Sequence, residues 1–392
     1  MNKSKKNLQL TILSLSIITV MAGAAVAPAL DQIRRNFADT SPLLIQMILT
    51  VPGLFIMLTN LSFTRISARF KTKAIAISGL ILYLVGGLMG GCVNNIYLLL
   101  FFRMILGIGT GLIMPLSTGL IAYYFDSSEG RRLMGYSIAA NNLGAMIAMV
   151  IVGFLSAIDW HLSFGVYLLG LIVFVFVMVF LPNEKVCAPK GEGIKSILIE
   201  KMPFIILIFL VNVGFYIHIA NFSIISIKEG IVNPENVGMV MSIHSVGALL
   251  SALLFEKIYQ RIEDRTGYIG VVGYIVSFIL FLYGENLGVF IVGLFCNGIG
   301  FAMLMAWVNS KAVHNIPKNS TTGIMSIMSV GMYFGQFCSP LIVNFIISLF
   351  KIEYVRFPYL MGMGVSLIIL LIQVFLQAKR RSEVRILEFS NS

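Results

Sequence analysis

The chain has 392 residues, of which 58% are hydrophobic and only 11% are charged, and its formal net charge is +11. Soluble domains contain about 25% charged and about 45–50% apolar residues, so this composition excludes a soluble enzyme, a disordered chain and a collagen. Four scattered cysteines without a C-x-x-C pair also exclude a disulfide-stapled secreted domain. Most of the chain must therefore lie in lipid.

Twelve segments predict membrane-spanning helices, because each supplies the roughly 20 apolar residues that cross about 30 Å of hydrocarbon. They cover residues 7–30, 40–64, 74–93, 96–125, 133–158, 160–183, 202–227, 236–255, 266–284, 286–310, 319–350 and 357–378. The pair Asn94-Asn95 favours a turn, which places Arg103 inside the fourth segment. The segments lack the strict alternation of a membrane β-barrel. The predicted fold class is therefore an all-α integral membrane protein.

Lysine and arginine predict how these helices are oriented. With the N-terminus in the cytoplasm, 22 of the 28 basic residues fall on the cytoplasmic side, five fall outside and Arg103 lies within a helix. We therefore expect a multi-pass protein of the plasma (inner) membrane, with its N- and C-termini in the cytoplasm. The positive net charge reflects this topology and does not predict a nucleic-acid partner.

An internal repeat divides the twelve helices into two sets of six. A shift of 191 positions superimposes four pairs of glycines: Gly23 and Gly214, Gly107 and Gly298, Gly109 and Gly300, and Gly144 and Gly335. We expect two pseudo-symmetric six-helix bundles, at 1–182 and 202–378, joined by a cytoplasmic linker at 183–201 and followed by a cytoplasmic tail at 379–392. A cleft between two such bundles can open to either side of the membrane as the bundles rock.

Short motifs resemble those of the major facilitator superfamily. Arg103-Met-Ile-Leu-Gly107-Ile-Gly109-Thr-Gly111 is close to the family's R-x-x-Q-G-x-G-x-A motif. The segment 64–73 is similar to the signature G-x-L-A-D-R-x-G-R-K, in which Arg69 and Lys73 are kept. Ala68 stands where the signature has the acid that helps to lock the cytoplasmic gate. The resemblance implies that fold, with gate or motif roles for Arg69, Lys73 and the three glycines of the first motif.

A third motif bears on the direction of transport. Ala140-x-x-x-Gly144-Ala145-x-x-Ala148 is similar to the G-x-x-x-G-P-x-x-G-G pattern of proton-driven exporters, without its proline. The chain is thus most like the bacterial drug:proton antiporter-type exporters. Small residues four apart, such as Gly107 and Gly111, also share a helix face and let helices approach closely in lipid. Helix packing alone therefore explains these residues as well as a transport role does.

The predicted function is secondary active transport of a small organic solute by alternating access, with export driven by the proton gradient. The alternative is an uptake symporter or a facilitated-diffusion carrier for a small neutral or anionic metabolite. The sequence has no P-loop, no nucleophile–base motif and no metal-ligand pattern, so we expect no enzyme activity, no metal and no cofactor. We expect a monomer in the lipid bilayer, with a small-molecule substrate and protons as its partners.

Polar residues in the middle of the predicted helices are candidates for the substrate cavity, with hydrogen bonding between helices as the alternative. They are Arg103, Asn141, Asn142, Asn212, Tyr216, His218, Asn221, Asn297, Tyr333 and Gln336. In the helix at 202–227, Asn212, Tyr216 and Ser223 share one face, whereas His218 and Asn221 share another. We expect only one of these faces to line the cavity.

Few ionisable side chains lie near the middle of the membrane. Arg103, about 10 Å below the outer surface, either contacts the substrate or anchors a neighbouring helix through carbonyl groups or Asn142. Asp31, His218 and His244 are candidates for proton coupling, although Asp31 is more simply interpreted as a solvated helix end. Because no acid lies mid-span, we expect a neutral, zwitterionic or anionic substrate in preference to a lipophilic cation.

Overall fold

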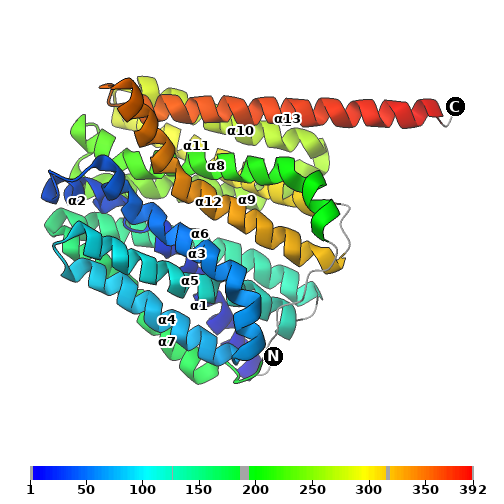
Figure 1. Ribbon diagram of the computed structural model, residues 1–392, viewed down its shortest axis with the longest axis horizontal. Helices are drawn as coiled ribbons and strands as arrows, with labels where there is room; N and C mark the ends of the chain where they lie inside the picture. Colours follow the sequence, from blue (N-terminus) through cyan, green and yellow to red (C-terminus); the bar gives the residue numbers. More distant parts are fainter. Residues whose placement is uncertain (1–2, 126, 186–193, 315–317, 391–392) are drawn as a thin grey trace.

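The computed structural model describes residues 3–125, 127–185, 194–314 and 318–390 (Figure 1), and no strand occurs in these ranges. The α-helices are α1 (Lys3–Ala24), α2 (Leu30–Asn36), α3 (Pro42–Arg69), α4 (Thr72–Leu88), α5 (Ile96–Tyr124), α6 (Ser127–Ile158), α7 (Leu169–Phe180), α8 (Ile194–Lys228), α9 (Val237–Ile262), α10 (Thr266–Tyr283), α11 (Leu287–Val313), α12 (Lys318–Phe350) and α13 (Phe357–Ser390). Five 3-10 helices lie between them: η1 (Ala27–Ala29), η2 (Met89–Cys92), η3 (Trp160–Leu168), η4 (Pro234–Asn236) and η5 (Glu263–Arg265).

The predicted all-α membrane fold is confirmed. Eleven stretches of the described chain are long and apolar enough to cross a membrane. One of them, Pro234–Tyr283, is 50 residues long and contains both α9 and α10, which η5 separates. The first stretch combines α1, η1 and α2, and the sixth combines η3 and α7. Counting α9 and α10 separately, the described chain contains the twelve predicted spans.

Several helices extend beyond the segments predicted from the sequence. Helix α8 begins at Ile194, eight residues before the predicted start, and α13 continues to Ser390 through the predicted tail. Charged side chains end a lipid-compatible segment, but Lys, Arg and Glu are good helix formers and do not end a helix. In the first span the opposite happens, because Pro28 lies in η1 and interrupts the helix between α1 and α2.

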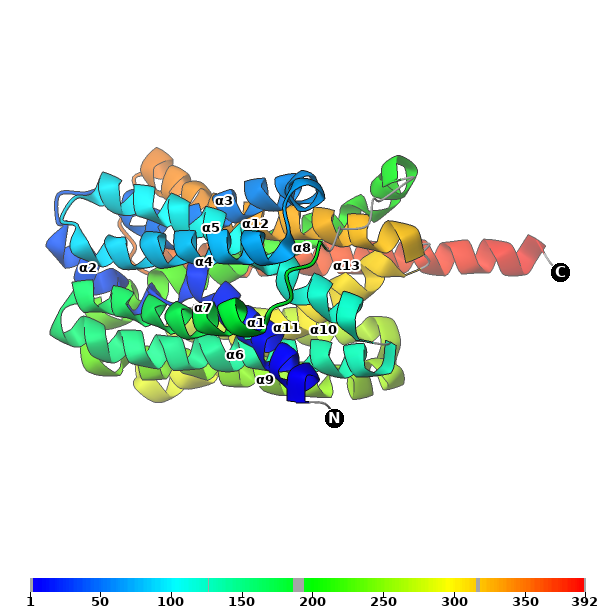
Figure 2. The ribbon, with the colours of Figure 1, turned by 90° about the horizontal axis from the view of Figure 1, so that it is seen from below.

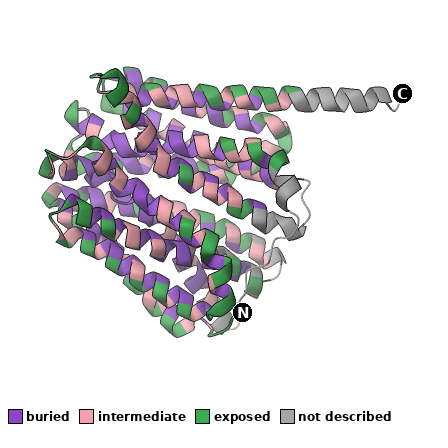
Figure 3. Ribbon diagram, viewed as in Figure 1, coloured by how far each residue is buried: buried purple, intermediate pink, exposed green. Residues whose placement is uncertain are grey.

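The helices lie side by side, with both chain termini toward one end of the molecule (Figures 1 and 2). We call this the terminal end. The loops that join α2 to α3, α4 to α5, α8 to α9, α10 to α11 and α12 to α13 lie at the other end, which we call the opposite end. Buried residues are concentrated where the helices face one another (Figure 3), as expected for a bundle whose outer surface contacts lipid.

The internal repeat seen in the sequence recurs in the helix contacts. A Cβ atom added to Gly109 of α5 would lie 2.6 Å from the carbonyl oxygen of Gly79 in α4. A Cβ atom added to Gly300 of α11 would lie 2.8 Å from the carbonyl oxygen of Gly270 in α10. Both residues of the second pair are shifted by 191 positions from the first. The contact between α4 and α5 is therefore repeated between α10 and α11.

Other glycines of the repeat give the same correspondence. Gly107 packs against Pro52 of α3, and its counterpart Gly298 packs against His244 of α9. Gly144 of α6 packs against α1, and its counterpart Gly335 of α12 packs against α8. Helices α3 and α9 therefore occupy matching positions in the two halves, as do α6 and α12. Gly111 lies against α3 beside Gly107, which confirms that the two share a face.

Candidate functional site

The two halves of the molecule meet along two seams. One is formed by α3 and α12, and the other by α6 and α9. In the internal repeat α3 corresponds to α9 and α12 corresponds to α6, so the two seams are equivalent. A substrate that passes between the halves must pass between these seams, so we describe each of them from its residues upward.

The first seam, which we call the polar seam, is closed by side-chain amides near the opposite end. Gln46 of α3 donates from Nε2 to Oδ1 of Asn221 in α8 at 2.7 Å, and its Oε1 accepts from Nδ2 of Asn344 in α12 at 2.7 Å. Gln46 and Asn221 are buried. In addition, Ser223 of α8 donates to the carbonyl oxygen of Ala27 in η1 at 3.0 Å. Four elements from both halves are thus joined at this end.

Deeper in the polar seam, glycines of one half make room for large polar side chains of the other. Gln336 of α12 donates from Nε2 to the carbonyl oxygen of Leu49 at 3.0 Å. A Cβ atom on Gly53 of α3 would lie 2.6 Å from Cδ of Gln336, and one on Gly23 of α1 would lie 2.6 Å from the hydroxyl of Tyr216. Any side chain at these two glycines would therefore displace the end of the Gln336 or Tyr216 side chain.

The polar seam continues to Tyr333, which lies nearest the terminal end in this series. The Tyr333 hydroxyl donates to Sδ of Met114 in α5 at 2.7 Å, and Nδ2 of Asn60 lies 4.0 Å from the same sulfur. Methionine sulfur is a soft and adaptable contact. Tyr216, Asn221, Tyr333 and Gln336, all predicted from the sequence as cavity residues, therefore come together along one seam.

The second seam, which we call the glycine seam, brings two backbones into direct contact. A Cβ atom on Gly153 of α6 would lie 2.6 Å from Cα of Gly238 in α9, and one on Gly238 would collide with the carbonyl oxygen of Met149. Figure 2 shows these two helices side by side. Small residues permit such close helix packing in lipid. This contact also lies near the opposite end.

Toward the terminal end the glycine seam opens. Gly135 lies 18 residues, or five helical turns, from Gly153 and so shares its face of α6, yet a Cβ atom there would meet nothing within 4 Å. Ile138, on the same face, is 52% exposed. On α9 the exposed fraction rises from 4% at Ser245 to 69% at Leu253. The halves are therefore closed at the opposite end and separated at the terminal end.

Both predicted faces of α8 contribute to the contact between the halves. Tyr216 and Ser223 come from one predicted face and Asn221 from the other, and all three contact the N-terminal half. Which of the two faces lines the cavity stays a prediction. Long side chains reach around the helix, and the N-terminal half touches α8 from two directions. Asn212 instead points into its own half, where Nδ2 donates to the carbonyl oxygen of Ile208 at 2.8 Å.

The two mid-span histidines lie inside the C-terminal half. The His218 ring is 5.7 Å from the His244 ring and 5.3 Å from the Phe281 ring, with interplanar angles of 21° and 18°. Neither ring nitrogen of His218 has a hydrogen-bond partner among the described residues. Asn297 donates from Nδ2 to Oγ of Ser277 at 3.0 Å beside this pair. The histidines thus form a buried aromatic cluster behind the seams.

Arg103 is buried inside the N-terminal half, away from both seams. Its Nη1 donates to the Tyr167 hydroxyl at 2.6 Å, and its guanidinium carbon lies 5.2 Å from the Phe164 ring. Tyr167 in turn donates to the carbonyl oxygen of Met21 at 3.4 Å. Arg103 thus ties α5 to η3 and, through Tyr167, to α1. The anchoring of a neighbouring helix, one of the two expected roles, thus occurs through Tyr167 and not directly through backbone carbonyls or Asn142, whose Nδ2 bonds to its own helix.

Arg103 also retains unused donors, since Nε and Nη2 are buried without a partner among the described residues. Asn141, another sequence candidate, is half-buried on α6, and its Oδ1 likewise lacks a described partner. Neither residue takes part in the seam contacts given above. The structure therefore separates these two candidates from the four that meet in the polar seam.

Asp31 corrects a further expectation. Its carboxylate is fully buried and accepts from Nη2 of Arg34 at 2.9 Å and from Nε of Arg35 at 2.8 Å. A solvated helix end is therefore wrong. The helix is interrupted at η1, and α2, which carries Asp31, packs against α8. Residues three and four positions apart on a helix are neighbours, so both arginines reach it.

The opposite end of the C-terminal half is braced by another ion pair. Arg356 donates from Nε and Nη2 to the Glu229 carboxylate at 2.8 and 2.6 Å, and from Nη1 to the carbonyl oxygen of Gly284 at 2.7 Å. The hydrogen bonds to Glu229 raise the pKa of Arg356. In the N-terminal half, the backbone amide and ring of His161 lower the pKa of Asp159. These contacts fix loops and leave the seams free.

The predicted gate residues lie at the terminal end of the N-terminal half. Lys73 donates from Nζ to the carbonyl oxygen of Met178 at 2.6 Å, and Arg69 is exposed at the end of α3. Glu184 accepts from the Tyr124 hydroxyl at 3.0 Å, and its backbone carbonyl accepts from Thr72 at 3.0 Å. Glu184 thus joins α4 and α5 at this end, and no motif in the sequence singles it out.

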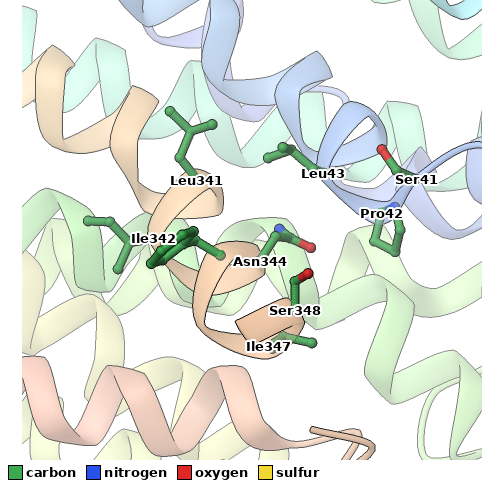
Figure 4. Close-up of a pocket in the computed structure, with 9 residues that line it drawn as sticks. Ser41, Pro42, Leu43, Leu341, Ile342, Asn344, Ile347 and Ser348 are labelled. Carbon is green, nitrogen blue, oxygen red and sulfur yellow. The ribbon is translucent and has the colours of Figure 1, made fainter. Parts of the chain in front are cut away.

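A hollow of about 870 Å³ lies beside the polar seam at the opposite end (Figure 4). It is lined by Ser41, Pro42, Leu43, Leu341, Ile342, Asn344, Phe345, Ile347 and Ser348. Asn344 belongs to both the hollow and the polar seam, so the hollow reaches the contact that closes this end. No group of three His, Cys, Asp or Glu side chains that could hold a metal occurs in the described part of the chain.

Comparison with known proteins adds three kinds of similarity. The family profile described as Major Facilitator Superfamily matches residues 12–231 and 204–390. Quinolone resistance protein NorA of Staphylococcus aureus (strain MSSA476) is 25% identical over 324 residues, which cover 79% of this chain and 82% of NorA. The protein named probable nitrate transporter NarT of Staphylococcus epidermidis is 24% identical over 410 residues, covering 98% of this chain and all of NarT.

Among solved structures, the nucleoside transporter NupG is similar, with a TM-score of 0.77 and 15% sequence identity. The match covers 95% of this chain and 98% of NupG. At this identity the likeness concerns the fold alone. It supports the division into two halves whose helices correspond, which the matched glycine contacts indicate independently.

Proposed function

The chain belongs to the major facilitator superfamily, and from this premise we propose that it exports small organic solutes across the plasma membrane by alternating access, driven by the proton gradient. One observation carries this proposal. The halves are joined at the opposite end by the polar seam and by Gly153 against Gly238, whereas the facing surfaces of α6 and α9 are exposed at the terminal end. A bundle pair closed at one end and open at the other is one state of a rocking carrier.

We assign the terminal end to the cytoplasm because most of the basic residues fall on that side of the predicted topology. The conformation described above is then open to the cytoplasm, the side from which an exporter takes up its substrate. Export is further supported by the likeness to NorA and by the small residues at Ala140, Gly144 and Ala148. We assign the substrate path to the space between the polar seam and the glycine seam.

The substrate class is argued from the polar groups that reach the space between the halves. Amides and hydroxyls, namely those of Gln46, Tyr216, Tyr333 and Gln336, surround this path, and no carboxylate contributes to the described hydrogen bonds between the halves. Such groups suit neutral or zwitterionic molecules with hydrogen-bonding atoms. Lipophilic cations would lack the buried carboxylate that attracts them.

Proton coupling is assigned to the histidine pair in preference to Asp31. The Asp31 carboxylate already has two arginine partners, which stabilise its charged form. His218 and His244 lie on α8 and α9, the helices that carry Tyr216 and Gly238 into the two seams. A proton taken up by this pair would change the packing of both helices. In His218→Gln and His244→Gln variants we expect slow transport with a flattened pH profile.

Accumulation in cells tests the direction of transport. A fluorescent quinolone, chosen because of the likeness to NorA, is measured in cells with and without the protein and with and without a protonophore. Export predicts several-fold lower accumulation that the protonophore restores. Equal accumulation in all conditions, or higher accumulation with the protein, contradicts the proposal. Cells that contain the Gly238→Leu variant serve as the control for expression without transport.

A second function is favoured by a separate observation. The likeness to NarT covers 98% of this chain, and the buried guanidinium of Arg103 has no carboxylate partner among the described residues. Uptake, by symport or by facilitated diffusion, of a small neutral or anionic metabolite is therefore the alternative. Nitrate uptake by cells that contain the protein, well above that of control cells, would favour it over export.

A further inference from the structure

The facing surfaces of α6 and α9 carry opposite charges at the terminal end. The two helices run antiparallel and touch at Gly153 and Gly238. Eighteen residues, or five turns, toward the terminal end lead to Gly135 on α6 and to Glu256 on α9. Gly135 and Glu256 therefore lie at matching depths, on the same helix faces that are in contact at the opposite end.

The charge opposite Glu256 is Arg132, which lies three residues, or about one turn, from Gly135 on α6. Both side chains are exposed. The guanidinium carbon of Arg132 lies 5.9 Å from the Tyr136 ring, and Glu256 accepts a long bond of 3.5 Å from Gln260. Within the described ranges neither residue takes part in a salt bridge. Each charge is thus available for a partner that this conformation does not supply.

Among the side chains that the structure describes, the polar seam offers no comparable pair at its terminal end. The last turns of α3 carry Arg65 and Arg69, and α12 begins at Lys318. Ala68 stands where the family signature has an acid. Like charges that approach each other are destabilising. If the terminal end is to be held closed by an ion pair, the glycine seam supplies opposite charges and the polar seam does not.

We propose that Arg132 and Glu256 form an ion pair across α6 and α9 when the terminal end closes, in place of the lock that Ala68 cannot provide. The proposal rests on the proposed function, because it assumes that the halves rock. Gly135 has a role in it. When α6 and α9 close as tightly as at Gly153, the missing side chain at Gly135 leaves room for Glu256, whose carboxylate then lies one turn from Arg132.

Cysteine labelling measures the open fraction directly. The full-length protein in lipid nanodiscs has its four cysteines, Cys92, Cys187, Cys296 and Cys338, replaced by serine. A single reporter, Ile138→Cys, is placed on the exposed face of α6, and the rate of reaction with a hydrophilic maleimide is recorded. The reporter is accessible while the terminal end is open and becomes covered when α6 and α9 close.

The lock predicts a specific pattern of rates. Glu256→Gln and Arg132→Gln should each increase the labelling rate about two- to five-fold, the range expected for an exposed ion pair. Arg132→Glu should increase it further, and the exchanged pair, Arg132→Glu with Glu256→Arg, should restore the original rate within about a factor of two. Lys257→Gln, next to Glu256 on α9, is the matched control and should leave the rate unchanged.

Other outcomes overturn the lock. Unchanged rates in both single variants, or faster labelling that the exchanged pair does not reverse, would show that the two charges do not meet. No labelling of the reporter in any variant would show that this face is covered. If the labelling pattern is as predicted but the protein does not export in cells, the ion pair is supported and the proposed function is contradicted. If the protein exports but the variants label at unchanged rates, only the ion pair is contradicted.

Discussion

The two seams between the halves occupy equivalent positions in the internal repeat but differ in chemistry. In the polar seam, α3 and α12 are joined by amide side chains such as Gln46 and Asn344. In the glycine seam, α6 and α9 touch through the backbones of Gly153 and Gly238. The repeat therefore preserves the positions of the helices and leaves their contact surfaces free to diverge.

This difference has a mechanical consequence. Hydrogen bonds between helices in lipid contribute about 0.6–1.7 kcal/mol each and can be exchanged for bonds to water or substrate. Backbone contact at Gly153 and Gly238 has no such alternative, and it tolerates no added atom without displacement. We therefore regard the glycine seam as the pivot of the rocking motion and the polar seam as the side that responds to substrate.

The largest effect is expected at the pivot. Gly238→Leu places a side chain against the carbonyl oxygen of Met149, and overpacking costs about 1–3 kcal/mol. We expect transport to fall more than ten-fold while the protein remains folded by circular dichroism. Gly364→Ala on α13 is the control, since its added methyl group meets no atom within 4 Å. Normal transport by Gly238→Leu would show that close backbone contact is dispensable.

A smaller effect is expected in the polar seam. Gln46→Leu removes both amide bonds and leaves Asn221 and Asn344 without their partner across the seam. The opposite end should open about three- to ten-fold more often. A cysteine in place of the buried Leu49 reports this opening through maleimide labelling. Ser62→Ala, which removes an exposed bond within α3, should leave labelling unchanged. The same result for Gln46→Leu would mean that the amides do not hold this end.

Removing the hydrogen bond of Gln336 tests how far the closure of the opposite end extends along the polar seam. Gln336→Leu removes the bond to the carbonyl oxygen of Leu49 but fills the same space beside Gly53. We expect about a two- to five-fold increase in the same labelling assay. Ser329→Ala, on the same helix with an exposed bond to Met325, is the matched control. If Gln336→Leu increases the labelling rate more than Gln46→Leu does, the contact that holds the opposite end closed lies deeper in the seam than we propose.

The smallest effect on the seams is expected from Arg103, which lies in neither. Arg103→Ala removes the bond to Tyr167 that ties α5 to η3, and a bond to a charged group contributes about 1.5–3 kcal/mol. We expect a lower thermal stability, in part rescued by Arg103→Lys, with normal transport per folded molecule. Loss of transport at unchanged stability would instead give Arg103 a direct role.

The candidate site was predictable only in part. Tyr216, Asn221, Tyr333 and Gln336 were identified because polar side chains are costly in the middle of a membrane helix. Asn344 was missed although it lies within a charge-free segment, and Gln46 lies near the end of one, where a polar residue requires no explanation. Polarity and depth are properties of the sequence, whereas the direction of a side chain depends on the neighbouring helices.

The sequence by itself determined the helical membrane fold, the repeat and the family, because hydropathy and glycine spacing act along the chain. It could not place Asp31, Arg103 or the histidine pair. Asp31 is buried on α2, which packs against α8, and Arg103 is held by η3, which lies 64 residues away from it at Tyr167. Tertiary structure also decided which end is closed, since that depends on how two preformed halves meet. Helices form from hydrogen bonds between residues close together in the sequence, whereas each seam forms between helices that are far apart in the sequence.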